Sequence, residues 1–165
     1  MATQYKIVLV GDGRVGKTTW VKKLSEGYFD TKYVATLGVE VSPIKVNTNR
    51  GEMTFNIWNC AGQDKYGGFR DGYYKLSTGA IVMFDSTNQE SMEHVDKWRN
   101  DVNRVCNTDG HFPVVVVASK CDQEVFPQGT IGISTKYNFN LLTPLLELAR
   151  QITEDPQLRF IVNNN

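Results

Sequence analysis

The most specific chemical signal in the sequence is a glycine-rich run near the N-terminus. Residues 11–18 read Gly-Asp-Gly-Arg-Val-Gly-Lys-Thr and fit the spacing G-x-x-x-x-G-K-[ST]. The run follows an apolar stretch and precedes a helical pattern, which is the context that this motif needs. Glycines let backbone N–H groups turn toward phosphate oxygens, and the N-terminus of the following helix adds a partial positive charge. The run therefore predicts a phosphate-binding loop.

Within this loop, two side chains have distinct chemical roles. Lys17 is expected to reach the β- and γ-phosphates of a nucleotide, and the Thr18 hydroxyl is expected to ligate Mg²⁺. Arg14 can touch phosphate or ribose or point to solvent, and the solvent-facing position is favoured. The residues expected to bind nucleotide here are Gly11, Asp12, Gly13, Arg14, Val15, Gly16, Lys17, Thr18 and Thr19.

Two further segments carry groups that a nucleotide triphosphatase needs around its γ-phosphate. Gly62 follows a predicted strand, and its N–H can approach phosphate because no side chain blocks it. Gln63 can hold a water molecule through both ends of its amide. Thr36 lies in a polar stretch between the first predicted helix and the second strand, where it can complete the metal shell. Their order after a phosphate loop gives these otherwise ordinary loop residues a functional interpretation.

Apolar runs and helical periodicity predict the elements that position these groups. Strands are expected at 5–10, 39–46, 53–58, 80–84, 113–118 and 131–134, with a hairpin turn at 49–51. Helices are expected at 18–24 and 141–152, and a long one is expected after an Asn88 cap, with Met92, Val95, Val102 and Val105 on one face. This alternation predicts an α/β fold with a mostly parallel six-stranded sheet and helices on both faces. Ligand-binding loops then lie at the carboxyl ends of the strands.

Composition narrows the class of protein. A length of 165 residues predicts one domain over 1–165. Eighteen basic residues balance eighteen acidic ones, which argues against direct nucleic-acid binding and against an anionic membrane surface. The sequence has no apolar run near 18 residues and no C-terminal cysteine for a prenyl anchor, so no membrane anchor is expected. The three cysteines are interpreted as free thiols in a reducing, intracellular compartment.

The sequence resembles the small GTPases of the Ras superfamily, and most closely their Ran branch, which acts in nuclear transport. The resemblance rests on KYVATLGVEV (32–41), NTNRG (47–51), AGQDKYGGFRDGYY (61–74) and LARQITEDPQLRF (148–160). It implies a small G domain of the P-loop NTPase class with GTP or GDP and Mg²⁺ as cofactors. It also implies that Thr36 is the switch threonine and that Gln63 is the catalytic, water-positioning glutamine beside the catalytic Lys17.

A guanine-reading motif is represented in altered form. The family's N-K-x-D appears as Ser119-Lys120-Cys121-Asp122, and its S-A-K loop appears as Ser134-Thr135-Lys136. The Asp122 carboxylate can accept from N1–H and N2–H₂ of guanine together, whereas adenine presents an acceptor there. The alkyl stem of Lys120 can lie across the face of the base.

Several residues depart from the family pattern. Ser119 replaces an asparagine and is expected to lose a buried hydrogen bond, at a cost of about 1–3 kcal/mol. Asn59 replaces an aspartate that holds Mg²⁺ through water, so weaker Mg²⁺ binding and faster nucleotide loss are expected. Only residues 123–133 separate Asp122 from Ser134, so the helix between the last two strands is expected to be shortened or missing, together with its basic patch. The acidic C-terminal tail of the Ran branch has no counterpart.

The resemblance implies a guanine-nucleotide switch with slow intrinsic GTP hydrolysis, acting as a monomer in the nucleus and cytoplasm. Its switch segments, 32–40 and 61–74, are expected to contact protein partners: transport receptors, an exchange factor or an activating protein. The alternative is a non-cycling decoy that occupies transport partners while binding nucleotide and Mg²⁺ weakly. An ATP-using P-loop enzyme fits less well, because no second substrate site or arginine-bearing lid is evident. His94 and His111 are interpreted as surface or structural residues, and Trp20 as a core residue or a partner anchor.

Overall fold

The computed structural model describes residues 3–25, 32–34, 39–60, 70–107, 109–121 and 129–161. Its strands are β1 (Thr3–Val10), β2 (Lys32–Val34), β3 (Val39–Thr48), β4 (Gly51–Asn59), β5 (Gly79–Asp85), β6 (Val114–Ser119) and β7 (Thr130–Gly132). Its helices are α1 (Lys17–Leu24), α2 (Arg70–Tyr74), α3 (Gln89–Glu93), α4 (Val95–Cys106) and α5 (Thr143–Thr153). In the described residues, no helix is both long enough and apolar enough to span a membrane.

The strands form one sheet in the order β2-β3-β4-β1-β5-β6-β7. Strand β1 pairs in parallel with β4 and β5, and β5, β6 and β7 continue the parallel arrangement. The β2-β3-β4 edge is antiparallel. All six predicted strands are present among the described residues, and the three-residue strand β2 extends the sheet beyond β3. Because β5 is buried along its whole length, it reads as an uninterrupted apolar run rather than an alternating pattern.

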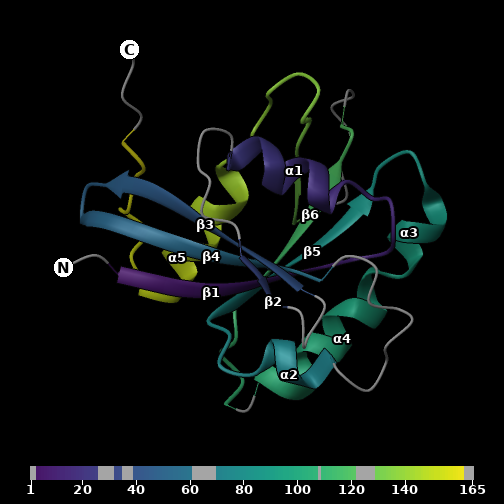
Figure 1. The fold of residues 1–165 in the computed structure, drawn as a ribbon, viewed down its shortest axis with the longest axis horizontal. Helices are drawn as coiled ribbons and strands as arrows, with labels where there is room; N and C mark the ends of the chain where they lie inside the picture. The colour runs from purple at the N-terminus through teal and green to yellow at the C-terminus, as the bar shows by residue number, and fades with distance from the viewer. Residues whose placement is uncertain are drawn as a thin grey trace.

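Helices cover both faces of this sheet, as the alternating pattern predicts (Figure 1). One core layer joins the sheet to α1 and α5, through Trp20 and Val21 on α1 and Leu145 and Leu148 on α5. The other layer joins it to α2 and α4, which lie on the opposite side in Figure 1. Trp20 is completely buried, and its indole N–H donates to the carbonyl of Leu141, so it is a core residue.

The β3–β4 hairpin is closed by the chain segment that follows α5, residues 155–161. Antiparallel bridging joins Thr48 to Phe160, and the N–H of Ile161 donates to the carbonyl of Asn47 at 2.7 Å. The Phe160 ring lies 5.9 Å from the Phe55 ring on β4. This segment, here called the C-terminal clasp, joins the end of the described chain to the far end of the sheet.

The single long helix predicted after Asn88 is incorrect. Asn88 does cap a helix, since its side chain accepts from the N–H of Ser91 at 3.0 Å, but helix α3 ends at Glu93 and α4 begins at Val95. The Ser91 hydroxyl donates to the carbonyl of Asn88, which competes with regular helix pairing. Met92, predicted on the apolar face, is 40% exposed.

Other predicted boundaries were close to those observed. Helix α5 begins two residues later than expected, and Pro144 lies in its first turn, where its missing N–H costs nothing. Ten positions, 120–129, separate β6 from β7, and residues 122–128 of that connection lie outside the described residues. The predicted loss of the helix between these strands therefore stays a prediction.

Candidate functional site

The glycine-rich run forms the connection from β1 to α1, and two of its glycines are required by the backbone. Gly11 has φ 145°, and a Cβ there would lie only 2.1 Å from the carbonyl oxygen of Met83 on β5. Gly16, with φ 108°, is the residue that precedes α1. Both conformations are strained for residues that carry a side chain. Between them, Arg14 is exposed and adopts φ 67°.

The start of α1 is suited to an anionic group. No side-chain hydrogen bond caps this helix in the described structure, and its first turn contains no acidic residue. Its first N–H groups and its dipole can therefore serve a phosphate. Buried Val15 anchors the loop in the core, and Thr19 lies exposed on the first turn.

Lys17 is 3% exposed, an unusual position for a lysine. Its Nζ donates to the carbonyls of Gly11 at 2.7 Å and Asp12 at 2.6 Å. The loop thus folds around the cation and holds it at the centre of the run. The two carbonyls hold the ammonium group inside the loop, where it can offset the charge of a bound phosphate.

Thr18 and Asn59, the two described residues predicted to serve Mg²⁺, contact each other directly. The Asn59 amide donates to the Thr18 hydroxyl oxygen at 3.0 Å. Both groups are neutral, and the described residues contain no cluster of three or more histidine, cysteine, aspartate or glutamate side chains suited to a metal. Mg²⁺ is usually held by one or two carboxylates together with substrate phosphates. The described donors supply no carboxylate, so the charge of a Mg²⁺ ion at this position would be balanced by the phosphates.

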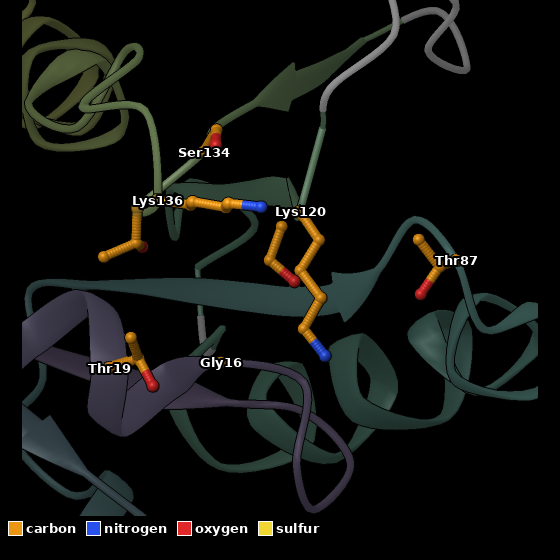
Figure 2. Close-up of a pocket in the computed structure, with 8 residues that line it drawn as sticks. Gly16, Thr19, Thr87, Lys120, Ser134 and Lys136 are labelled. Carbon is orange, nitrogen blue, oxygen red and sulfur yellow. The ribbon is translucent and has the colours of Figure 1, made fainter.

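A pocket of about 390 Å³ opens beside the phosphate loop, at the carboxyl ends of β5 and β6. Figure 2 shows Gly16 and Thr19 on the α1 side and Ser134 and Lys136 on the opposite side. The Lys120 side chain runs between these two sides. The lining residues are Gly16, Thr19, Thr87, Ser119, Lys120, Ser134, Thr135 and Lys136. The pocket is large enough for a small ligand and brings the phosphate loop together with both base-reading segments predicted from the sequence.

Ser119 lies at the base of this pocket and is 4% exposed. Its hydroxyl lies within hydrogen-bond distance of the carbonyls of Val15 in the phosphate loop and Phe84 on β5. The expected loss of one buried hydrogen bond relative to asparagine stays a prediction, but the shorter serine side chain still makes buried contacts of its own. Serine reaches the phosphate loop because β6 passes close to it, so the two halves of the site are joined directly.

Lys120 is held by an acidic residue that the sequence interpretation did not single out. Its Nζ donates to Oδ2 of Asp85 at 2.7 Å. Burial alone would raise the pKa of the Asp85 carboxyl, but hydrogen bonds from Lys120 and Thr87 outweigh it and hold that pKa below its usual value of 3.8. Lys120 itself has φ 55°, which turns the chain sharply after β6. Asp85 was detectable, because it is the last residue of the buried strand β5, at the carboxyl end of the strands where ligands bind.

Several predicted site residues lie outside the described residues: Thr36, Gly62, Gln63 and Asp122. Their roles stay predictions. Strand β2 and the start of β3 frame the segment that contains Thr36, and β4 and α2 frame the segment that contains Gly62 and Gln63.

Cys60 and Cys121 are buried near the site, as expected for small packing residues. Burial raises the pKa of the Cys60 thiol to about 12, although the charges of Lys17 and Lys6 lower it in part. The Cys60 thiol therefore stays protonated near neutral pH, which does not favour a nucleophilic or redox role.

A known protein family matches most of this chain. The model of the Ras family matches residues 6–154. The chain belongs to the Ras family. Ras-family domains act as GTP-binding switches and are generally GTPases that bind guanine nucleotide with Mg²⁺ and interact with regulators and effectors. The match agrees with the predicted superfamily and with the predicted α/β small G-domain fold.

Proposed function

We propose that this protein is a guanine-nucleotide switch of the Ran-like branch, with slow intrinsic GTP hydrolysis, that acts in nucleocytoplasmic transport. The carrying observation is the pocket that joins the phosphate loop to Ser119, Lys120 and residues 134–136. Its volume suits a base and sugar, and the phosphates then extend over buried Lys17 and the start of α1.

In this proposal, each group has one task. Lys17 offsets phosphate charge, and Thr18, Thr36 and, through water, Asn59 hold Mg²⁺, which supplies further charge neutralisation at the phosphates. Asp122 selects guanine, and the alkyl stem of Lys120 covers the base. Gln63 orients the attacking water, and Gly62 donates its N–H to the γ-phosphate. No arginine is among the described residues that line the pocket, and in this proposal fast turnover requires an activating protein.

The Ran-like assignment rests on the segments 32–41 and 61–74, whose sequences resemble the switches of that branch. Transport receptors, an exchange factor or an activating protein are the proposed partners, in the nucleus and the cytoplasm. A purified nuclear transport receptor that binds the GTP-loaded protein, and not the GDP-loaded one, would support this branch. Equal or absent binding in both states would contradict it.

Nucleotide binding is tested by titrating the purified protein with fluorescent GDP, GTP and ADP, with Mg²⁺ and with a chelator. The proposal predicts guanine-selective binding that weakens with chelator and is lost in Lys17→Ala, followed by slow single-turnover GTP hydrolysis. Absence of binding to all three nucleotides would rule out a cycling switch.

The neutral Asn59 side chain contacts Thr18 at the position where the family has an aspartate that helps to hold Mg²⁺. This favours one alternative, a Ran-like decoy that binds partners without cycling. The Asn59→Asp substitution separates the two. A carboxylate at this position adds a negative charge that helps to hold Mg²⁺. The Mg²⁺-dependent slowing of GDP release is therefore expected to increase by about 10-fold or more. The matched control is Asn56→Asp on the same strand, where the side chain contacts Gln4 and no effect is expected. A cycling switch hydrolyses GTP before the substitution, whereas a decoy does so only after it or not at all.

A further inference from the structure

One side chain of the phosphate loop is held by groups that belong to neither the loop nor the pocket. Asp12 Oδ2 lies 2.6 Å from Nδ1 of His94, and Oδ1 accepts from the indole Nε1–H of Trp98 at 2.8 Å. Because an ionised carboxylate only accepts hydrogen bonds, His94 Nδ1 must carry the proton in this contact. His94 lies at the junction of α3 and α4, and Trp98 is 4% exposed on α4.

Gly11 is packed closely against Met83 on β5, but the residues just after Asp12 have few side-chain attachments. Gly13 has no side chain, and a Cβ added there would meet open space. Arg14 is exposed. The carboxylate of Asp12 therefore fastens the segment 12–14 to the helices, while Val15 anchors the next residue in the core. The carbonyl of the same Asp12 accepts from Lys17 Nζ at 2.6 Å, so fixing Asp12 also fixes the lysine that faces phosphate.

The negative charge of Asp12 gives its contacts with His94 and Trp98 a second role. A carboxylate in a loop that binds phosphates repels them unless it is turned aside and its charge is offset. The two donors from α4 and its junction direct the Asp12 carboxylate to themselves. A free Asp12 side chain would both loosen the loop and place negative charge near the ligand.

We propose that His94 and Trp98 are positioning residues for the nucleotide: they hold Asp12 and thereby preset the phosphate loop and Lys17. This inference rests on the proposed nucleotide binding. It assigns a task to a histidine and a tryptophan on α4 and its junction, neither of which lines the pocket.

The contact of Asp12 with His94 and Trp98 is tested without nucleotide. A ¹H–¹⁵N spectrum of the nucleotide-free protein reports the tryptophan indole N–H groups, and Trp98→Phe identifies the signal of Trp98. Asp12→Ala is expected to move that signal upfield while leaving those of Trp20 and Trp58 in place. A Trp98 signal that does not respond to Asp12→Ala would overturn the proposal, whether or not nucleotide binds.

The positioning role is tested by GDP affinity. His94→Ala and Trp98→Phe are expected to weaken GDP binding about 10-fold each, the equivalent of one hydrogen bond to a charged group. His94→Asn keeps an N–H donor on Cγ, at the position of Nδ1, and is expected to restore affinity to within about threefold of the native protein. The matched control, Asp96→Asn, changes an exposed carboxylate on α4 and is expected to leave affinity unchanged.

The two proposals fail in different ways. Native protein that binds GDP, with His94→Ala binding equally well, overturns the positioning role and leaves the proposed function intact. Rescue by asparagine distinguishes positioning from a general loss of fold, since a structural defect from losing the imidazole ring would persist in His94→Asn. Native protein that binds no GDP overturns the proposed function, and the positioning role with it.

Discussion

Ser119 places one hydroxyl between two backbone carbonyls that belong to different parts of the site. Ser119→Ala leaves those buried carbonyls of Val15 and Phe84 without this donor. We expect a loss of about 1–3 kcal/mol in the free energy of unfolding and a parallel weakening of GDP binding, because the phosphate loop loses its link to β6. Urea denaturation and fluorescent-nucleotide titration measure the two effects.

The control for this substitution is Ser25→Ala, whose hydroxyl bonds to Val21 within its own helix turn. Less than about a twofold change in GDP affinity is expected there, because the bond is local to α1. Equal effects of the two substitutions on affinity would show that Ser119 does not act through the phosphate loop.

The lowered pKa of the Asp85 carboxyl is expected to make the stability of the protein depend on pH. Hydrogen bonds from Lys120 and Thr87 outweigh burial and hold the pKa of this carboxyl below 3.8 in the folded protein. Protonation therefore favours the unfolded chain, and the stabilisation is present above about pH 3.8 and lost as pH falls through the lower folded value.

At about pH 7, Asp85→Asn is expected to lower the free energy of unfolding by about 1–3 kcal/mol, and the difference from the native protein should shrink toward about pH 3. Urea denaturation across this range measures it. Asp96→Asn, at a side chain that is 84% exposed, serves as the control. A difference that stays constant with pH would show that the charge of Asp85 contributes nothing.

For single residues, a role could be predicted from the sequence where a motif defines it, but not where it depends on packing contacts. Glycines at fixed spacing before Lys17 predict a phosphate loop, because the function of this motif depends on local backbone geometry. The partners of Asp12 could not be read in this way, since His94 and Trp98 lie more than eighty positions away and nothing in a helical pattern shows which loop it touches.

Helix α4 is joined to helix α2 by a side-chain hydrogen bond. The hydroxyl of Tyr74, at the end of α2, donates to Oδ2 of Asp101 on α4 at 3.0 Å. Tyr74→Phe keeps the buried ring and removes this bond, so a loss of about 1–2 kcal/mol in unfolding free energy is expected. Tyr137→Phe, at a ring that is 61% exposed, should change stability by less than about 0.5 kcal/mol. Similar midpoints of thermal unfolding for the two variants would argue against the α2–α4 link.

Elements were predictable where burial gives a simple period. The β5 and β6 strands are apolar throughout, and the β3–β4 hairpin alternates about a turn at Gly51. The division at His94 was not predictable, because residues 89–106 have helical periodicity on both sides of it.

Across the whole molecule, the C-terminal clasp completes the core. Leu158 is fully buried in the layer that contains α1 and α5, although the family match ends at residue 154. Leu158→Ala is expected to cost about 2–5 kcal/mol of unfolding free energy, as for other large-to-small core changes. Ile161→Ala, three residues on and 52% exposed, should cost less than about 0.5 kcal/mol. Denaturant unfolding compares the two, and equal costs would mean that the clasp is only peripheral.

The clasp also sets how the molecule carries mechanical load. Its last hydrogen bonds run from the N–H of Ile161 to the carbonyl of Asn47 and from the N–H of Asn49 to the carbonyl of Arg159, whose own N–H donates to the Asn49 side chain. A pull on the C-terminal end is therefore expected to break these bonds in order, starting at Ile161, before helix α5 begins to unravel. Tension on the tail would first peel this short segment from the β3–β4 hairpin.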